Sequence, residues 1–161
     1  LTIGKKKFLP FDRELREAEA RLGILRDKMM SFADMDAEAF IPLAEAYKIP
    51  KDSPGRESVM EEALLGAAQV PMEIMRAGAE CIDIFEYLLD HSSVMVISDV
   101  GVGAALASGA VKGAGLNIFI NTKSMKNRDE ADRLDYEAES ILNKYIPLAD
   151  SIFDRVTARL R

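Results

Sequence analysis

Long stretches of helical periodicity, with no strand pattern between them, constrain the fold of this chain most strongly. Apolar residues recur at steps of three and four over three segments: Asp12 to about Tyr47, Glu57–Leu89 and Asp129–Arg161. Steps of this size place side chains on one face of an α-helix. Since no regular succession of short alternating segments is present, the sequence predicts an all-α bundle of long helices.

Short polar or proline-containing stretches separate the periodic segments. They lie at Ile49–Gly55, Asp90–Ser93 and Ser124–Arg128, and stretches of this kind end helices. Three prolines fall inside the predicted helices: Pro42, Pro71 and Pro147. Because proline removes a backbone donor and crowds the preceding turn, we expect these helices to be kinked or split.

Composition limits the class of protein. The chain has 161 residues, 48% of them hydrophobic, which suits one domain spanning residues 1–161. Its net charge of −6 argues against a nucleic-acid partner. The single cysteine, Cys81, cannot form an internal disulfide, which is typical of cytoplasmic proteins. The most apolar stretch, Val94–Ile120, is interrupted by polar residues such as Asp99 and Lys112, so no membrane span is predicted.

The stretch from Val94 to Lys126 holds five of the ten glycines: Gly101, Gly103, Gly109, Gly113 and Gly115. A strand-like VMVI before the first two is typical of a dinucleotide-binding loop. That fingerprint needs glycine or alanine where this chain has Leu106, and a parallel sheet that the other segments do not provide. We therefore predict a small-faced helix from Asp99 to Asn121, capped by Ser98 and packed closely against a partner subunit.

Asp36 lies on a heptad series of otherwise apolar residues: Leu15, Leu22, Met29 and Leu43. An ionised carboxylate at an apolar position is costly unless it is paired or hydrogen-bonded, and carboxylates in such places often transfer protons. Two interpretations stay open: a proton-transfer residue, or a carboxylate that faces solvent or is paired for structural reasons. Asp34 and Glu38 lie on other azimuths of the helix and are expected to be solvated.

Cationic and amide side chains offer further candidate binding groups. Two cationic clusters are present: Lys5, Lys6 and Lys7, and Lys123, Lys126 and Arg128. Either suits an anionic ligand tail or a solvated helix end. Asn117 and Asn121 lie one helical turn apart and suit the edge of a heterocycle, or bonds to neighbouring helices. The lone His91 lies in a polar turn, so no metal site is predicted.

Five blocks along the chain resemble the formiminotransferase-cyclodeaminase family: LTIGKKKF at the start, DAEAF at Asp36–Phe40, VPMEIM at Val70–Met75, SDVGVGA at Ser98–Ala104 and NIFINTKSM at Asn117–Met125. The resemblance covers essentially the whole chain, in the same order. This family of folate one-carbon metabolism includes stand-alone bacterial methenyltetrahydrofolate cyclohydrolases. NTKSM, together with LAEAY-K-IP, is more similar to these than to the fused cyclodeaminase domain.

The resemblance implies an all-α homodimer that binds a tetrahydrofolate derivative as substrate near the subunit interface, with no bound cofactor. The cyclohydrolase reaction, which we expect here, adds water to 5,10-methenyltetrahydrofolate and gives 10-formyltetrahydrofolate. The alternative cyclodeaminase reaction converts 5-formiminotetrahydrofolate to the methenyl form and ammonia. Both need a proton shuttle, and the family's proposed acid/base aspartate corresponds to Asp36.

Other roles follow from the same resemblance. Asp99 is expected to bond the pterin amino group, with Asn117 and Asn121 nearby. The glutamyl carboxylates are expected to meet a set of lysines: Lys5, Lys6, Lys7 and Lys123. Family members usually carry a helix and a Pro-Gly-Gly-Gly-Ser-type loop ahead of the segment that matches Leu1, and we expect both to be missing from this sequence. A helical dimerisation domain without catalysis is the alternative of another class.

Overall fold

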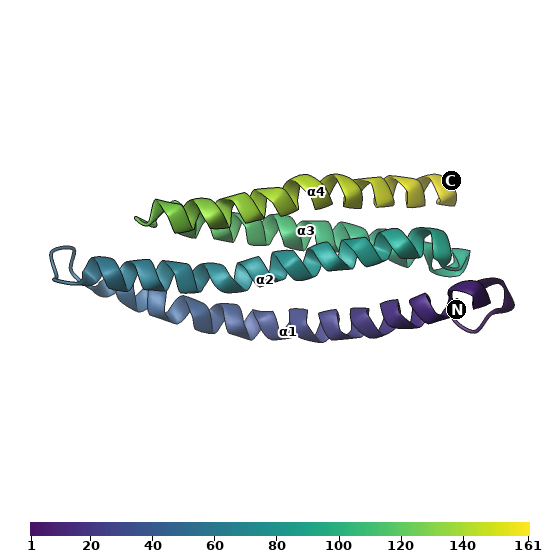
Figure 1. The fold of residues 1–161 in the computed structure, drawn as a ribbon, viewed down its shortest axis with the longest axis horizontal. Coiled ribbons are helices and arrows are strands. Elements are labelled where there is room, and N and C mark those ends of the chain that lie inside the picture. The colour runs from purple at the N-terminus through teal and green to yellow at the C-terminus, as the bar shows by residue number, and fades with distance from the viewer.

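The computed structural model describes residues 1–161 as four long helices joined by short loops (Figure 1). The helices are α1 (Asp12–Lys48), α2 (Arg56–His91), α3 (Ile97–Thr122) and α4 (Arg128–Leu160). Two short 3-10 helices, η1 (Lys6–Phe11) and η2 (Val94–Val96), precede α1 and α3. Successive long helices run antiparallel, and both termini lie at the same end of the bundle.

The all-α prediction is confirmed, and each predicted helix agrees with an observed one to within a few residues. No strand is present, and the first glycines of the glycine-rich stretch lie inside α3, so a dinucleotide loop is excluded. Pro42, Pro71 and Pro147 each lie inside one continuous helix. The expectation that they split helices is therefore wrong, and the expected kinks stay a prediction.

The start of α3 differs from the predicted one. Ser98 is not the cap, because the helix already begins at Ile97, directly after η2. Ser93 acts as the cap of η2, since its hydroxyl accepts a hydrogen bond from Met95 N at 3.3 Å. The Ser93 N–H in turn donates to Thr2 Oγ1 at 2.9 Å. The extra 3-10 turn thus moves the capping residue upstream and ties it to the start of the chain.

Two glycines let α3 approach its neighbours closely. A Cβ at Gly103 would lie 2.5 Å from the Phe85 ring of α2, and a Cβ at Gly101 would lie 2.9 Å from Val156 of α4. Both distances are shorter than packed carbon atoms allow. These glycines thus pack closely against α2 and α4 of the same chain, whereas the predicted packing of the helix against a partner subunit stays a prediction.

The segment Val94–Thr122 is long and apolar enough to cross a membrane by length and composition alone, contrary to the sequence expectation. In the bundle α3 packs against both α2 and α4, and apolar core helices of soluble proteins meet the same criterion. The absence of a membrane partner stays a prediction.

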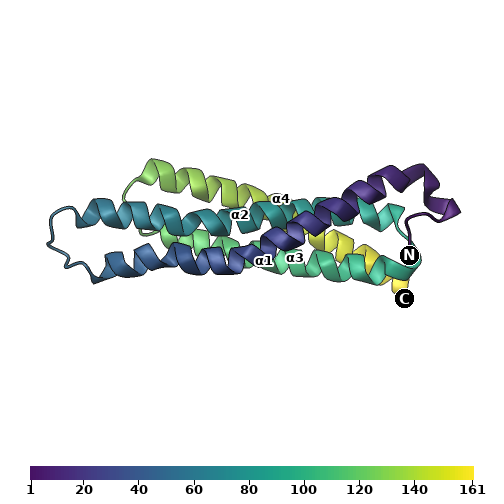
Figure 2. The same cartoon turned by 90° about the horizontal axis from the view of Figure 1, so that it is seen from below.

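Helix α1 packs mainly against α2 and runs obliquely to the other helices (Figure 2). Ion pairs fix one edge of this contact. Lys28 Nζ lies 2.7 Å from Glu73 of α2. Seven residues away on each helix, Arg21 of α1 pairs with Glu80 of α2. The opposite edge of α1 faces α3 and carries no such pairs. The consequence is a groove between α1 and α3, with α2 as its floor.

Candidate functional site

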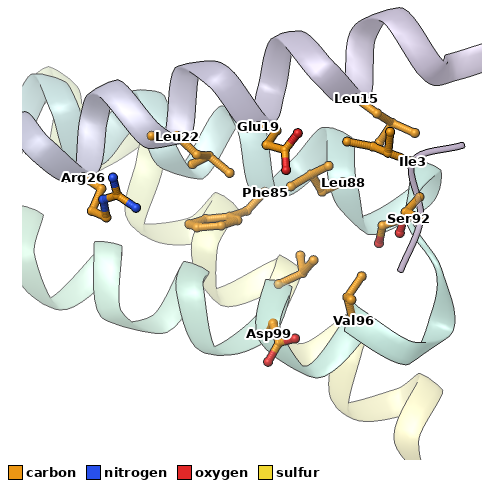
Figure 3. A pocket seen from close by; sticks show the side chains of 13 residues that line it. Ile3, Leu15, Glu19, Leu22, Arg26, Phe85, Leu88, Ser92, Val96 and Asp99 are labelled. Atoms are coloured by element: carbon orange, nitrogen blue, oxygen red, sulfur yellow. The ribbon is translucent and has the colours of Figure 1, made fainter.

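Two hollows lie along the groove between α1 and α3. The polar hollow is a cavity of about 280 Å³ lined by Asp36, Ala37 and Phe40 of α1, Ala67 and Pro71 of α2, and Asn117, Ile120 and Asn121 of α3. The apolar cleft, nearer the chain termini, is a cavity of about 550 Å³. Its main lining residues are Leu15, Glu19, Leu22, Arg26, Phe85, Leu88, Val96 and Asp99 (Figure 3).

The polar hollow brings together three of the residues singled out in the sequence. Asp36 lies on α1, whereas Asn117 and Asn121 lie on α3, about eighty residues further along the chain. They meet because α1 and α3 pack against the same part of α2. Carboxylate and amide groups therefore face one small cavity, which suits hydrogen bonding to a heterocycle and proton transfer.

Asp36 is a half-buried carboxylate without a protein partner. It forms neither a hydrogen bond nor an ion pair within the chain. On the opposite edge of α1 the pattern is reversed, because Lys28 and Arg21 bond Glu73 and Glu80 and lower the pKa of both carboxyl groups. The interpretation of Asp36 as a structurally paired carboxylate is thus excluded within the chain. Its oxygens are available to a ligand or to water.

Pro71 leaves one backbone carbonyl of α2 without its usual helical donor. A proline inside a helix has no N–H to donate to the carbonyl four residues earlier, which here belongs to Ala67. Both residues line the hollow with Asp36. The Ala67 carbonyl therefore lacks its usual helical donor and needs another one, such as water, to be satisfied.

The two asparagines do not bond neighbouring helices. Asn121 Nδ2 donates to the Asn117 carbonyl of the same helix at 2.9 Å, and this leaves the Asn121 side-chain oxygen free. The Asn117 side chain is exposed and has no partner in the chain. The sequence left two interpretations open for these asparagines: bonds to neighbouring helices, or recognition of the edge of a heterocycle. The structure shows no bonds to neighbouring helices, so recognition of a ligand edge stays the prediction.

The apolar cleft holds Asp99 and several residues that sequence reasoning missed. Its floor is the ring of Phe85, held close to α3 by Gly103. Glu19 and Arg26 approach from α1, and Asp99 lies on the α3 side (Figure 3). The spacing of Glu19 and Arg26 is one heptad, which places them on the same face of α1. The spacing is visible in the sequence, but nothing in the local pattern distinguishes these two residues from the other charged residues of α1.

Ser92 gives the apolar cleft an unsatisfied polar group. Its hydroxyl oxygen is buried, has no hydrogen-bond partner, and belongs to a residue that lines the cleft (Figure 3). A buried hydroxyl without a partner is unfavourable, so a ligand group or water in the cleft would stabilise it.

The structure separates Asp99 from the two asparagines. Asp99 and Asn117 lie on the same straight helix, eighteen residues apart, which corresponds to about 27 Å along its axis. The expectation that Asn117 and Asn121 lie near Asp99 is therefore wrong within one chain. A single pterin ring cannot contact both groups in the same subunit.

The lysines expected to meet glutamyl carboxylates are also divided between the two ends of the bundle. The three N-terminal ones are exposed around η1: Lys5, Lys6 and Lys7. Lys123 is exposed just after α3, at the opposite end, and makes no ion pair. Its neighbours Lys126 and Arg128 pair with acidic side chains at 2.6 and 2.9 Å. One anionic tail can therefore reach only one of the two groups.

A metal site is not formed by the protein side chains. No group of three or more histidine, cysteine, aspartate or glutamate residues is arranged to hold a metal ion. The thiol of Cys81 is half-buried in α2, and this burial raises its pKa. It is accordingly a weak nucleophile at neutral pH.

Comparison with known proteins identifies the class to which this helical groove belongs. The sequence model of the formiminotransferase-cyclodeaminase family matches residues 1–140. Methenyltetrahydrofolate cyclohydrolase of Methylorubrum extorquens is 30% identical over 164 aligned residues, which cover 99% of this chain and 79% of the relative. The chain belongs to the formiminotransferase-cyclodeaminase family, as its five sequence blocks predicted.

Two further relatives are longer proteins, and one solved structure has a similar fold. Formimidoyltransferase-cyclodeaminase of Gallus gallus is 30% identical over 78% of this chain, and that of Sus scrofa is 27% identical over 99%. The chain spans only 24% and 30% of their lengths. The crystal structure of formiminotetrahydrofolate cyclodeaminase from Thermotoga maritima matches with a TM-score of 0.78 at 24% identity, over 98% of this chain and 74% of that one. This last match supports the four-helix fold.

Proposed function

We propose that this protein is a methenyltetrahydrofolate cyclohydrolase, which adds water to 5,10-methenyltetrahydrofolate and forms 10-formyltetrahydrofolate. The observation that carries the proposal is the unpaired, half-buried Asp36 carboxylate in a hollow that the amide side chains of Asn117 and Asn121 also line. The near-complete coverage by a relative of that name supports the choice of reaction. The folate derivative is the substrate, and no bound cofactor is needed.

Asp36 would handle the proton of the attacking water. As water bonds to the cationic methenyl carbon, the carboxylate accepts one of its protons, and a neutral hydroxymethylene bridge forms. The bond from this carbon to N5 then breaks while the carboxyl group returns the proton to N5. Loss of the hydroxyl proton to solvent completes the formyl group on N10, so the reaction releases one proton overall.

The polar surroundings of Asp36 suit this sequence. The Ala67 carbonyl could accept a hydrogen bond from the second O–H of the same water and so orient it, since Pro71 leaves this oxygen without the usual helical donor. Asn117 and Asn121 offer amide groups to the edge of the ring system.

The cyclodeaminase reaction is the second candidate, favoured by the cyclodeaminase relatives. There N10 attacks the formimino carbon of 5-formiminotetrahydrofolate, and ammonia leaves after its nitrogen is protonated. The same carboxylate would deliver that proton. We further propose a cytoplasmic homodimer that acts on folate and has no nucleic-acid or membrane partner.

Paired assays with the two substrates test the proposal. The purified protein is mixed with 5,10-methenyltetrahydrofolate, and the near-ultraviolet absorbance of the methenyl group is followed. Loss of absorbance well above the buffer rate is expected, with 10-formyltetrahydrofolate as product. Ammonia release from 5-formiminotetrahydrofolate, without hydrolysis of the methenyl form, would assign the cyclodeaminase reaction. Only buffer rates in both assays would support a helical dimerisation domain without catalysis.

A further inference from the structure

Arg26 is the only lysine or arginine among the residues that line the two hollows. It lies at one end of the apolar cleft, away from Ile3 and Ser92 (Figure 3). Its only partner in the chain is the adjacent Asp27, at 2.8 Å, and the two side chains are 70% and 68% exposed. Because an exposed pair of this kind contributes little, the guanidinium is available to an anionic ligand in the groove.

The position of Arg26 along α1 suits the length of a folate tail. Arg26 lies ten residues before Asp36, which corresponds to about 15 Å along the helix axis. In a tetrahydrofolate, N10 is the amine of a p-aminobenzoylglutamate arm that ends in two carboxylates. By ordinary bond lengths this arm spans about 10 Å from N10 to a carboxylate. The long side chain of Arg26 covers the remaining distance.

The floor of the groove between Arg26 and Asp36 is apolar. At Gly78 of α2 an added Cβ would lie 2.6 Å from Val111 of α3 and 3.9 Å from Met29 of α1. The three helices therefore converge at this point. Met29 is half-buried and lies three residues after Arg26 and seven before Asp36. A floor of this kind suits one face of a benzoyl ring.

Small side chains lie on both walls above this floor. Heptad steps along α1 place the exposed Ala33 between Arg26, which lines the cleft, and Phe40, which lines the hollow. On α3 the same step places Ala110 one heptad before Asn117. Neither series has a large side chain between the two hollows.

We propose that Arg26 binds a glutamyl carboxylate of the substrate, whose benzoyl ring lies on the groove floor between Asp36 and Arg26. This role of Arg26 rests on the proposed function, because it places the one-carbon bridge at Asp36. The planar guanidinium can donate two parallel hydrogen bonds to the carboxylate. Arg26 thereby determines specificity for a substrate with an anionic tail and takes no part in the proton transfer.

The lysines that the family resemblance suggested are less suited to this carboxylate. Lys5–Lys7 precede α1, whose first residue, Asp12, lies about 36 Å from Asp36 along the helix axis. Lys123 follows the last residue of α3 and lines neither hollow. Arg26 is therefore the cation that the groove itself places within reach of the tail.

The charges beyond Arg26 limit the path of the tail. Glu19 and Asp99 line the apolar cleft on the side away from the polar hollow (Figure 3). Their carboxylates would repel an anionic tail. The glutamyl group should therefore leave the groove at Arg26 instead of entering the cleft.

Kinetics with a charged and an uncharged tail test this role. The second substrate is 5,10-methenyltetrahydrofolate with both glutamyl carboxylates converted to amides, which keep the size of the tail and remove its charge. Arg26→Gln should raise KM for the charged substrate about tenfold or more, with kcat little changed, and should leave KM for the diamide nearly native. Arg26→Lys should recover part of the lost affinity, since it keeps the charge but not the paired hydrogen bonds.

Arg13→Gln is the matched control. Arg13 also lies on α1, its side chain is 80% exposed, and it pairs only with Glu14 and Glu17 of the same helix. It lines neither hollow, so KM should stay native. An unchanged KM of Arg26→Gln for the charged substrate, or an equal rise for the diamide, would overturn the proposal. A charge-dependent rise in Lys123→Gln alone would place the tail beyond α3 and overturn it as well.

Binding of the isolated tail separates this role from the proposed function. p-Aminobenzoyl-L-glutamate is titrated into the protein, and binding is followed by nuclear magnetic resonance. Native and Arg13→Gln proteins should bind it equally, and Arg26→Gln about tenfold more weakly. Equal binding by Arg26→Gln, or no saturable binding by the native protein, would overturn the proposal. If the native protein acts on neither folate derivative, the proposed function fails, and this titration still decides whether Arg26 holds the tail.

Discussion

The two hollows of the groove differ in the kind of group that each offers. The apolar cleft surrounds a cavity of about 550 Å³ with leucine, valine and phenylalanine, and its charges lie at the rim. The polar hollow is about half that size and contains an unpaired carboxylate beside amide groups. Apolar area stabilises a bound ring, whereas an available carboxylate moves protons. We propose from this difference that the apolar cleft contributes to binding and that the polar hollow carries out proton transfer.

The largest effect is expected at the polar hollow. Asp36→Asn removes the proton acceptor while it keeps the shape of the side chain, so kcat for methenyltetrahydrofolate should fall by about 10²-fold or more. Initial rates from the loss of methenyl absorbance measure this. Asp34→Asn is the matched control, because Asp34 is exposed two residues away, and it should keep native turnover. Near-native turnover in Asp36→Asn would remove this carboxylate from the mechanism.

The next largest effect is expected on the stability of the protein, from a substitution at the floor of the apolar cleft. Gly103→Ala places a Cβ 2.5 Å from the Phe85 ring, which should lower the free energy of unfolding by about 1–3 kcal/mol. Thermal or urea unfolding followed by circular dichroism measures this. At Gly66 of α2 an added Cβ meets nothing within 4 Å, so Gly66→Ala should instead stabilise the protein by up to about 1 kcal/mol. Equal effects at both sites would contradict the tight contact that shapes the cleft floor.

A substitution in the cleft wall should affect binding more than turnover. Leu22→Gln places a polar group against the apolar lining and should raise KM about tenfold, with kcat little changed, because the lost contact is the same in ground and transition state. Ile24→Gln is the control, since Ile24 is 56% exposed on another face of α1, and it should leave KM unchanged. A fall in kcat at constant KM for Leu22→Gln would contradict the division between the two hollows.

Much of the fold could be predicted from periodicity, because the apolar stripes of these helices are long and are ended by clear turn residues. The proximity of Asp36 to Asn117 and Asn121 could also be predicted in part, because both helices were expected to pack in one bundle. The distance between Asp99 and Asn117 was implicit in the helix prediction itself, since eighteen helical residues span about 27 Å. Grouping Asp99 with Asn117 and Asn121 by motif alone takes no account of this distance along the helix.

Other features depend on contacts between segments distant in sequence. The cleft floor exists because Gly103 admits the Phe85 ring, and no local pattern marks that pair. The extra turn of η2 moved the cap from Ser98 to Ser93, which is held by Thr2 at the start of the chain. Glu19 and Arg26 line the cleft from α1, which runs obliquely to the other helices (Figure 2).

The most direct test of the division between binding and chemistry is the affinity of the Asp36→Asn protein for its substrate. Since this variant should turn over 5,10-methenyltetrahydrofolate very slowly, the dissociation constant can be measured by equilibrium titration of the methenyl absorbance or by rapid dialysis. We predict a dissociation constant within about threefold of the native KM, because the apolar cleft is unchanged. Loss of binding as large as the loss of turnover would contradict this division and make Asp36 a binding residue.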